Sequence, residues 1–210
     1  MTAFVLGTAW ADSILVYEKS APETAGVKHT VSIVGRWLRI DSEPKQKSDY
    51  TLIDTGRMLM FDVDDGNKRF YQSHVGQFYW PDVGAIRLMP VREKSSVAGL
   101  RCQKIKEMGS EKPKAEHCMS VGSALGLSER ETKTLSRLFL IARRVGLDWG
   151  GVATPDERQI SLSSLDLEKG ASLKFLSVEH QSIPDNRMKI PNDYQPIMVE
   201  TPKSQQKKKQ

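Results

Sequence analysis

The sequence lacks most of the short patterns that indicate catalysis or metal binding. It contains only two cysteines, and 15 residues separate them, whereas a redox motif has the spacing Cys-x-x-Cys. None of the four histidines has a metal-ligand spacing, such as two histidines one helical turn apart. A Gly-x-Ser-x-Gly elbow and a phosphate-binding glycine loop are also missing. The sequence therefore predicts no metal, no cofactor and no enzymatic activity, and a hydrolase with an unrecognised site is the weakest hypothesis.

Long apolar runs and a strong charge bias are missing as well. No apolar run approaches the roughly 18 residues that a membrane-spanning helix needs, so no membrane span is predicted. The formal net charge is +5, but without the four lysines of residues 201–210 it falls to +1. The basic character therefore belongs to this tail and does not indicate a nucleic-acid groove. The tail has nothing apolar to bury and is predicted to be disordered; contact with an anionic membrane surface or peptidoglycan is the alternative.

The two cysteines, Cys102 and Cys118, lie on either side of a turn-rich stretch at 108–113. A hairpin centred near Ser110 would bring the two thiols opposite each other, so the sequence predicts a disulfide and with it an oxidising compartment. The bond would close a loop of about 17 residues, worth about 3 kcal/mol on the chain-entropy estimate. A metal site formed with His117 is the alternative, but it would offer three ligands, and a disulfide removes two of them.

Residues 1–11 are predicted to be a signal-peptide remnant. They carry no charge and end in Ala9-Trp10-Ala11. Signal peptidase accepts small residues at the positions that Ala9 and Ala11 occupy, which would make Asp12 the first mature residue. A basic n-region and most of an apolar h-region are missing. An ordinary first strand followed by a turn is the alternative.

Most of the first hundred residues have strand character. Short apolar stretches alternate with glycine-containing turns at 54–57 and 64–67, a pattern typical of an antiparallel meander. The apolar parity changes at Gly35-Arg36, where we expect a bulge or sharp bend that repairs the register. The predicted strands and hairpin arms cover residues 13–17, 31–40, 50–54, 58–63, 69–72, 100–107 and 116–121.

One strong amphipathic helix is predicted over residues 129–145. Ser128 and Glu131 form a capping box, in which each side chain can bond the backbone amide of the other residue. Apolar residues then recur at steps of three and four up to Val145, and Gly146 ends the helix.

The chain then returns to strands, at 160–167 and 173–178. Pro191 and Pro196 lack amide donors, so residues 188–196 are predicted to form an edge strand or extended arm. Together the elements predict an α+β fold for a single domain at 12–200. Its curved antiparallel sheet, a half-open barrel, packs on the one main helix.

This order of elements resembles an uncharacterised family of bacterial secreted proteins with a lipoprotein-carrier-like fold. The resemblance implies a half-open β-barrel with a concave apolar side and a periplasmic location, reached across the inner membrane of a Gram-negative bacterium. It implies no established chemistry, although carrier relatives bind acyl chains in their cavity. The stretches that carry the resemblance are residues 32–41, 51–54, 58–64, 69–71 and 99–102, Cys118, the helix after Ser128, and residues 188–194.

The main functional hypothesis is a non-enzymatic periplasmic protein that binds an apolar, lipid-like ligand between sheet and helix. The alternative is a cell-envelope interaction or assembly factor without a small ligand, whose core is filled. Aromatic residues at 78–80 then belong either to a flap over the ligand or to a loop that covers the core. The candidate ligand-binding residues are Trp37, Met58, Met60, Phe61, Tyr79, Trp80, Leu138 and Phe139.

Overall fold

The computed structural model describes residues 12–45, 48–75, 87–144 and 157–197. Residues 1–11 and 201–210, with the predicted signal remnant and disordered tail, lie outside these ranges. The strands are β1 (Ser13–Ala21), β2 (Thr24–Val34), β3 (Trp37–Glu43), β4 (Tyr50–Asp54), β5 (Leu59–Asp64), β6 (Arg69–His74), β7 (Arg87–Val97), β8 (Leu100–Met108), β9 (Pro113–Val121), β10 (Gln159–Asp166), β11 (Ser172–His180) and β12 (Gln195–Pro196).

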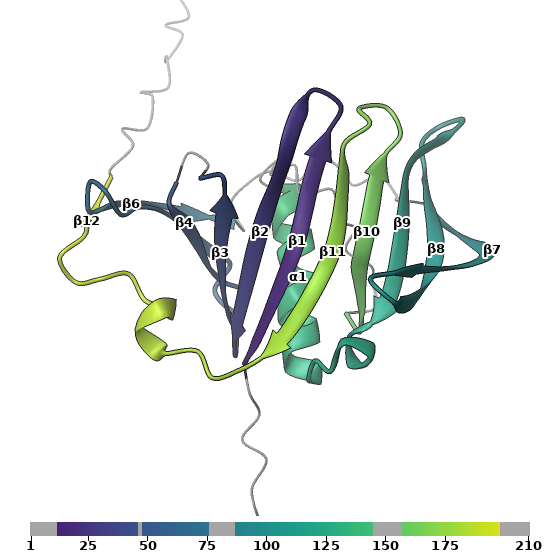
Figure 1. The fold of residues 1–210 in the computed structure, drawn as a ribbon. Helices are drawn as coiled ribbons and strands as arrows, with labels where there is room; N and C mark the ends of the chain where they lie inside the picture. Colours follow the sequence, from purple (N-terminus) through teal and green to yellow (C-terminus); the bar gives the residue numbers. More distant parts are fainter. Residues whose placement is uncertain (1–11, 46–47, 76–86, 145–156, 198–210) are drawn as a thin grey trace, which may run out of the picture.

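All the described strands belong to one sheet, in the order β12-β6-β5-β4-β3-β2-β1-β11-β10-β9-β8-β7 (Figure 1). Neighbouring strands are antiparallel, except for β12, which is parallel to β6. The fold is therefore a large open antiparallel sheet with one α-helix. The described residues contain more strand and less helix than the predicted α+β class implies.

Helix α1 (Glu129–Arg144) begins at the predicted capping box. The Ser128 N–H donates to Glu131 Oε2 over 2.8 Å, and the Glu131 N–H donates to Ser128 Oγ over 3.3 Å. In Figure 1 the helix lies behind the central strands, and it contacts β2, β3 and β10. We call the sheet surface that contacts α1 the helix face and the opposite surface the outer face. The predicted helix is confirmed to residue 144, and residue 145 lies outside the described ranges. No helix in the described residues is long and apolar enough to cross a membrane.

Large apolar side chains close the helix face. Tyr17 of β1 lies edge-on to Phe139 of α1 and to Phe175 of β11, with ring centroids 6.1 Å and 5.7 Å apart. These three side chains are 0%, 1% and 2% exposed, respectively. A side chain beside an empty, water-sized cavity would expose surface to it, so these three line no cavity. The same core includes Leu15, Val31, Ile33, Leu38, Ile40, Ile53, Met60, Leu135, Leu138, Ile141, Ile160, Leu162 and Leu173.

The turn at Gly35-Arg36 corrects one expectation. The sequence analysis predicted a bulge or bend within a strand region, whereas the structure has a tight hairpin between β2 and β3, with Val34 paired to Trp37. Across an antiparallel hairpin, odd-numbered residues of one strand can face even-numbered residues of the next. The change of parity is therefore what the hairpin itself requires. Gly35 has φ +60°, a left-handed conformation that glycine adopts without a Cβ penalty.

A smaller apolar cluster occupies the outer face of β4 and β5. Because neighbours in a strand point to opposite faces, Ile53 joins the helix-face core and Leu52 joins this outer cluster, with Tyr50 and Val63. The arm at 181–197 covers the cluster through Ile190 and other partly buried residues.

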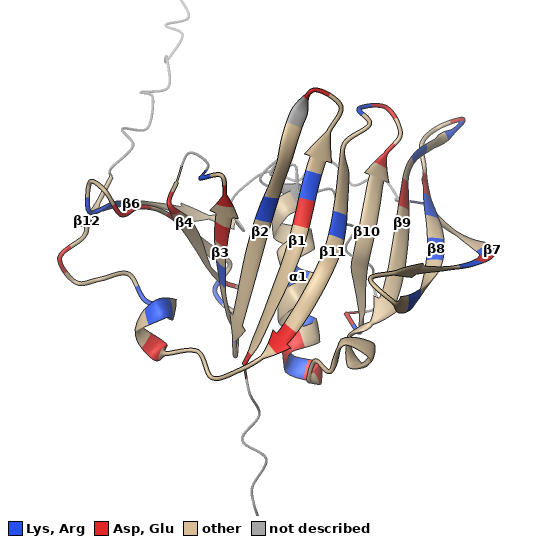
Figure 2. Cartoon of the chain, in the orientation of Figure 1, with Lys and Arg blue, Asp and Glu red and all other residues tan. Residues whose placement is uncertain are grey.

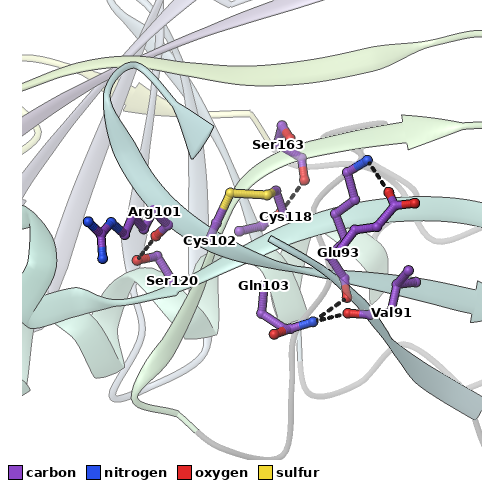
Figure 3. The surroundings of a disulfide bond; sticks show 10 residues. Val91, Glu93, Arg101, Cys102, Gln103, Cys118, Ser120 and Ser163 are labelled. Carbon is purple, nitrogen blue, oxygen red and sulfur yellow. Dashed lines mark hydrogen bonds and ion pairs between the residues drawn. A yellow bond between two sulfur atoms is a disulfide. The ribbon is translucent and has the colours of Figure 1, made fainter. Parts of the chain in front are cut away.

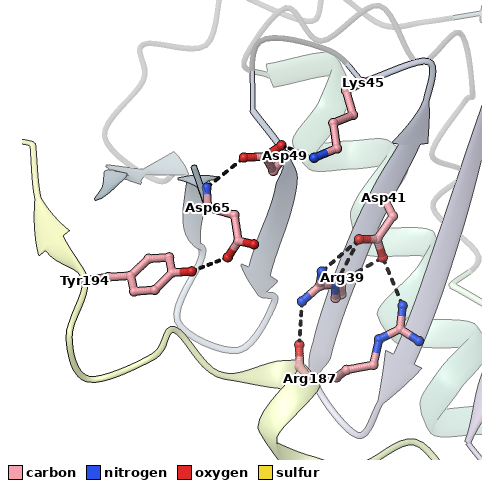
Figure 4. Close-up of polar contacts among 7 residues, drawn as sticks. All are labelled: Arg39, Asp41, Lys45, Asp49, Asp65, Arg187 and Tyr194. Carbon is pink, nitrogen blue, oxygen red and sulfur yellow. Dashed lines mark hydrogen bonds and ion pairs between the residues drawn. The ribbon is translucent and has the colours of Figure 1, made fainter. Parts of the chain in front are cut away.

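Polar contacts tie the arm to the sheet (Figure 4). The Arg187 side chain pairs with Asp41, while Arg39 donates to the Arg187 carbonyl over 3.2 Å. The arm ends in β12 at the edge of the sheet, beside β6. The predicted edge strand is therefore confirmed, at residues 195–196.

One buried histidine adds a pH-sensitive group to the helix face. His29 of β2 is 6% exposed, and its Nδ1 lies 2.8 Å from Ser42 Oγ. Desolvation by burial, together with the positive charge of Lys19, lowers the pKa of His29 to about 4. The fold therefore holds this imidazole in its neutral form near neutral pH.

Candidate functional site

The edge strand β7 turns back over the sheet instead of extending it sideways. It pairs with β8, with its register broken between Pro90 and Lys94, and it also contacts β9 and β11. In Figure 1 β7 crosses in front of β9, whereas α1 lies behind the sheet. β7 therefore covers part of the outer face and leaves a groove of about 300 Å³ beneath it. We call this the β7 groove.

A cross-strand row of four residues forms the floor of the β7 groove. Lys104 pairs with Cys118, Cys118 with Ser163, and Ser163 with Lys174. Lys174 in turn lies opposite Glu18 of β1. Tyr17, the residue before Glu18, packs against Phe139 of α1. Neighbouring strand residues point to opposite faces, so Glu18 and the row of residues beside it point to the outer face.

A second row and the overhanging strand complete the walls. Leu165 lies between Glu116 and Ser172, and Ser95 and Val97 of β7 also line the groove. Leu165 is 39% exposed, and Leu167, two residues further along the chain, is 44% exposed. The groove thus combines an apolar lining with several hydroxyl groups.

The predicted disulfide is confirmed, and it lies in the floor of this groove. Cys102 and Cys118 have Cα atoms 5.4 Å apart and are 7% and 4% exposed. Figure 3 shows Ser163 next to the bond. The disulfide joins β8 to β9, close to where β7 folds over the sheet. It also removes the alternative metal site with His117, because both thiols are consumed.

One lysine that lines the β7 groove forms no ion pair with a described residue. Lys104 Nζ lies 3.1 Å from Glu93 Oε2 at an exposed position, where ion pairs contribute little stability. The side chain of Lys174 lines the groove and forms no hydrogen bond or ion pair with any described residue, although Glu18 is its cross-strand neighbour. Figure 2 shows lysine or arginine and acidic residues on both β1 and β11. The Glu116 carboxylate also lines the groove, with its Oε1 3.6 Å from Lys106 Nζ, so among the described residues Lys174 is the lining lysine without an ion pair.

The candidate ligand-binding residues do not form one set. Met60, Leu138 and Phe139 belong to the helix-face core and are 6%, 0% and 1% exposed. Met58, with φ +57°, precedes β5 and packs partly buried against the same core.

Two other candidates, Trp37 and Phe61, stack on the outer face with ring centroids 6.4 Å apart. Leu38 and Met60, their neighbours in the chain, join the core on the opposite face. Tyr79 and Trp80 lie outside the described residues.

A second hollow, of about 650 Å³, lies at the start of α1 and opens to solvent. Here Gly122 packs closely against the helix, since an added Cβ would lie 1.9 Å from Thr132 Oγ1. The described part of the chain contains no cluster of three or more His, Cys, Asp or Glu residues that could hold a metal ion. The residues that line the hollow are Val121, Gly122, Ser123, Leu127, Glu129, Thr132 and Arg158.

The sequence analysis did not predict the β7 groove. Residues 87–97 were assigned to no strand, because Pro90 and four charged residues interrupt the apolar alternation. The two apolar residues on either side of Ala98-Gly99, Val97 and Leu100, are the local signal of a hairpin there. Contact between β7 and β11 joins segments about 80 residues apart, and no periodicity encodes such a contact.

No protein-family model and no curated protein matches the chain. Among solved structures, an uncharacterized conserved protein from Thermus thermophilus is similar over 90% of this chain and 91% of its own, with a TM-score of 0.51 and 12% sequence identity. At this identity the likeness shows the fold alone.

Two further structures are less similar. MucB, solved in complex with MucA(peri), matches 90% of this chain and 57% of its own, with a TM-score of 0.44 and 11% identity. A LolA superfamily protein from Nitrosomonas europaea matches 87% of this chain and 91% of its own, with a TM-score of 0.33 and 9% identity. Because both scores are below 0.5, the resemblance to lipoprotein carriers stays a prediction.

Proposed function

We propose that the protein is a non-enzymatic cell-envelope factor that binds another protein through its outer face and holds no ligand between sheet and helix. The observation that carries this proposal is the closed helix face. Tyr17, Leu138 and Phe139 are at most 1% exposed, so they offer no surface to a lipid. This favours the second hypothesis of the sequence analysis over an apolar-ligand carrier.

The disulfide supports a location outside the cytoplasm. Cys102 and Cys118 are the only cysteines of the chain, and both are used. Structural disulfides persist in oxidising compartments such as the bacterial periplasm.

The two ends of the sheet are poor sites for a partner. β12 is two residues long and ends in Pro196, which has no N–H to donate. β7 contains Pro90, a broken register and charged residues. These features protect sheet edges from pairing with another strand. A partner is therefore expected on the outer face and not as an added strand.

The β7 groove is the part of the outer face whose lining best indicates the chemistry of a binding partner. Leu165 lines it and is 39% exposed, and the Lys174 side chain forms no ion pair with a described residue. The occupant that matches is an extended segment of another envelope protein with apolar side chains and an acidic residue, because a carboxylate would neutralise Lys174.

Site-specific photocrosslinking in the native host tests this proposal. A photoreactive amino acid at Leu165 should crosslink to one defined protein, identified by mass spectrometry. The same probe at Tyr71, on β6 and 36% exposed, should not capture it. Lys174→Glu should abolish the crosslink from Leu165. Lys28→Glu is the matched control, because Lys28 lies in the same outer-face row but does not line the groove.

Two outcomes would overturn the proposal. One is crosslinking that is equal from Leu165 and Tyr71 or insensitive to Lys174→Glu. The other is a stoichiometric lipid on the unmodified protein, seen by native mass spectrometry after gentle purification. The latter would restore the carrier hypothesis.

A further inference from the structure

The turn between β2 and β3 and the turn between β4 and β5 both contact α1. The Thr134 hydroxyl of α1 donates to the carbonyl oxygen of Gly35 over 2.8 Å. In the second turn, the carbonyl oxygen of Thr55 accepts from Arg137 Nη1 over 3.4 Å. The two turns also contact each other, because the N–H and the hydroxyl of Thr55 donate to the carbonyl oxygen of Arg36 over 3.1 Å and 2.9 Å. Three segments of the chain thus meet at one corner of the molecule.

Glycines in these turns leave room for arginine side chains. A Cβ added at Gly35 would lie 3.0 Å from Arg130 Nη2. A Cβ added at Gly56 would lie 3.0 Å from Arg36 Cδ. The second turn also contains Arg57, and α1 carries two more cations at helical spacing from Arg130. We call this group the arginine corner; its members are Arg36, Arg57, Arg130, Lys133 and Arg137.

The arginine corner holds more positive charges than it has acidic partners. The fully buried Asp54 carboxylate lies 3.1 Å and 4.0 Å from the two turn arginines. The Glu157 carboxylate lies 3.0 Å from Lys133 and 3.4 Å from Arg137. Arg130 forms no ion pair with a described residue. Five cations therefore share two carboxylates, which leaves a surplus of three positive charges.

The other two acids at the start of α1 do not pair with the arginine corner. Glu131 is buried, and its carboxylate accepts the hydroxyls of Ser13 and Ser128, each over 2.6 Å. Glu129 lines the hollow at the start of α1 and forms no ion pair with a described residue. The helix itself therefore does not pair off the surplus charge.

The arginine corner is open to solvent and has no exposed apolar centre. The Arg57 and Lys133 side chains are 69% and 51% exposed. In the described part of the chain, the exposed large apolar side chains lie on β6, β7, β9 and β10, just after β10, and at the end of the arm. Protein–protein interfaces have a desolvated apolar core, which this surface does not offer. Anionic phospholipid attracts cations without such a core, and a guanidinium group can bond two phosphate oxygens in parallel.

We propose that the arginine corner binds the phosphate headgroups of an anionic phospholipid bilayer. The contact is peripheral, because the corner has no exposed apolar side chain to insert. The corner lies beside β2 to β5, whereas the β7 groove is formed by β7 to β11. The two sites are separate, so this proposal does not rest on the partner proposed for the groove.

A second basic region supplies the matched control. Residues 87–118 contain eight lysines and arginines and four glutamates. Their cations are divided between the two faces of the strands, since Arg101 and Lys104 lie three residues apart in β8 and point to opposite faces. Arg101 is exposed and forms no ion pair with a described residue. It therefore matches Arg130 in residue type, exposure and charge but belongs to the other end of the sheet.

Cosedimentation of the full chain with lipid vesicles tests the proposal. The protein should bind vesicles made of equal parts of phosphatidylglycerol and phosphatidylcholine, and should not bind phosphatidylcholine alone. Salt at about 1 M should abolish the binding, because the screening length falls to about 3 Å. Arg130→Gln should lower the partition coefficient about fivefold, which is the contribution of one cation at an anionic surface. Arg101→Gln should leave it within about twofold of the unmodified protein.

Two controls separate the arginine corner from other causes of binding. Each variant keeps the lysine tail, so the tail contributes equally to all three proteins. Urea denaturation should show equal stability for Arg130→Gln and the unmodified protein, because Arg130 forms no ion pair with a described residue. Equal loss of binding in Arg130→Gln and Arg101→Gln overturns the proposal, as does an unmodified protein that does not bind anionic vesicles. Inorganic phosphate that displaces the protein more than sodium chloride of equal ionic strength also overturns it, because the corner would then bind the free ion.

Discussion

Replacing Phe139 by alanine tests whether the helix face is a filled core. Phe139 is 1% exposed and lies edge-on to Tyr17. Truncating a buried phenylalanine to alanine typically costs about 3–5 kcal/mol, because the lost transfer energy is joined by the cost of a cavity. The edge-on ring contact contributes about 0.5–1.5 kcal/mol beyond the buried area. We therefore expect Phe139→Ala to lower the free energy of unfolding by about 4 kcal/mol.

Urea denaturation followed by circular dichroism measures this change, with the disulfide kept oxidised throughout. Lys133→Ala is the matched control on the same helix. The Lys133 side chain is 51% exposed, and its Nζ lies 3.0 Å from Glu157 Oε2. An exposed ion pair contributes at most about 1 kcal/mol. The better helix propensity of alanine offsets part of that loss.

A filled core and a ligand site predict opposite results for Phe139→Ala. A loss below about 1 kcal/mol, similar to that of Lys133→Ala, would show that the side chain is not packed as described. A bound lipid that disappears from the purified variant, with stability largely kept, would place Phe139 in a ligand site. Either result would refute the argument that the helix face is closed.

Three further predictions concern other parts of the fold. Replacing Cys102 and Cys118 together by alanine should lower the free energy of unfolding by about 3 kcal/mol, measured by urea denaturation against the oxidised protein. The pKa of His29 is lowered from 6.5 to about 4 in the folded state, so the unfolded chain binds the proton first. Stability is therefore complete above about pH 6.5 and should fall by up to roughly 3 kcal/mol as the pH drops to about 4; His29→Gln should flatten that loss in pH-dependent urea melts. Gly122→Ala should destabilise the protein by about 1–3 kcal/mol, because its new Cβ would collide with Thr132. Adding Thr132→Ala should recover part of this loss in a double-mutant cycle, and a fully additive result would contradict the collision.

Elements with a local cause were predictable from the sequence. The capping box at Ser128 and Glu131 satisfies backbone donors within one turn of helix, so four residues suffice to locate the start of α1. Likewise, the turn at 108–113 lies between two short apolar stretches, which fixed the pairing of Cys102 with Cys118. In each case the interacting groups are close in the chain, and little else can compete.

Local sequence patterns do not predict which face of the sheet an apolar strand residue occupies. Trp37 and Phe61 looked like partners of Met60 and Phe139 because all four are large and apolar. The pairing of β3, β4 and β5 places the first two on the outer face and Met60 on the helix face, where Phe139 of α1 belongs to the same core. Alternation assigns neighbouring residues to opposite faces, but it does not say which face the helix covers.

The sequence by itself determined the meander, the capped helix and the disulfide hairpin, because their stabilising contacts lie within a few residues. Only the tertiary structure decided how β7 folds over β9 and β11, and how Ser13 meets Glu131 and His180, which are 118 and 167 residues away from it. Such contacts depend on the packing of the whole sheet around α1, because chain entropy opposes each of them until many form together. The β7 groove is a product of that packing, so no short motif marks it.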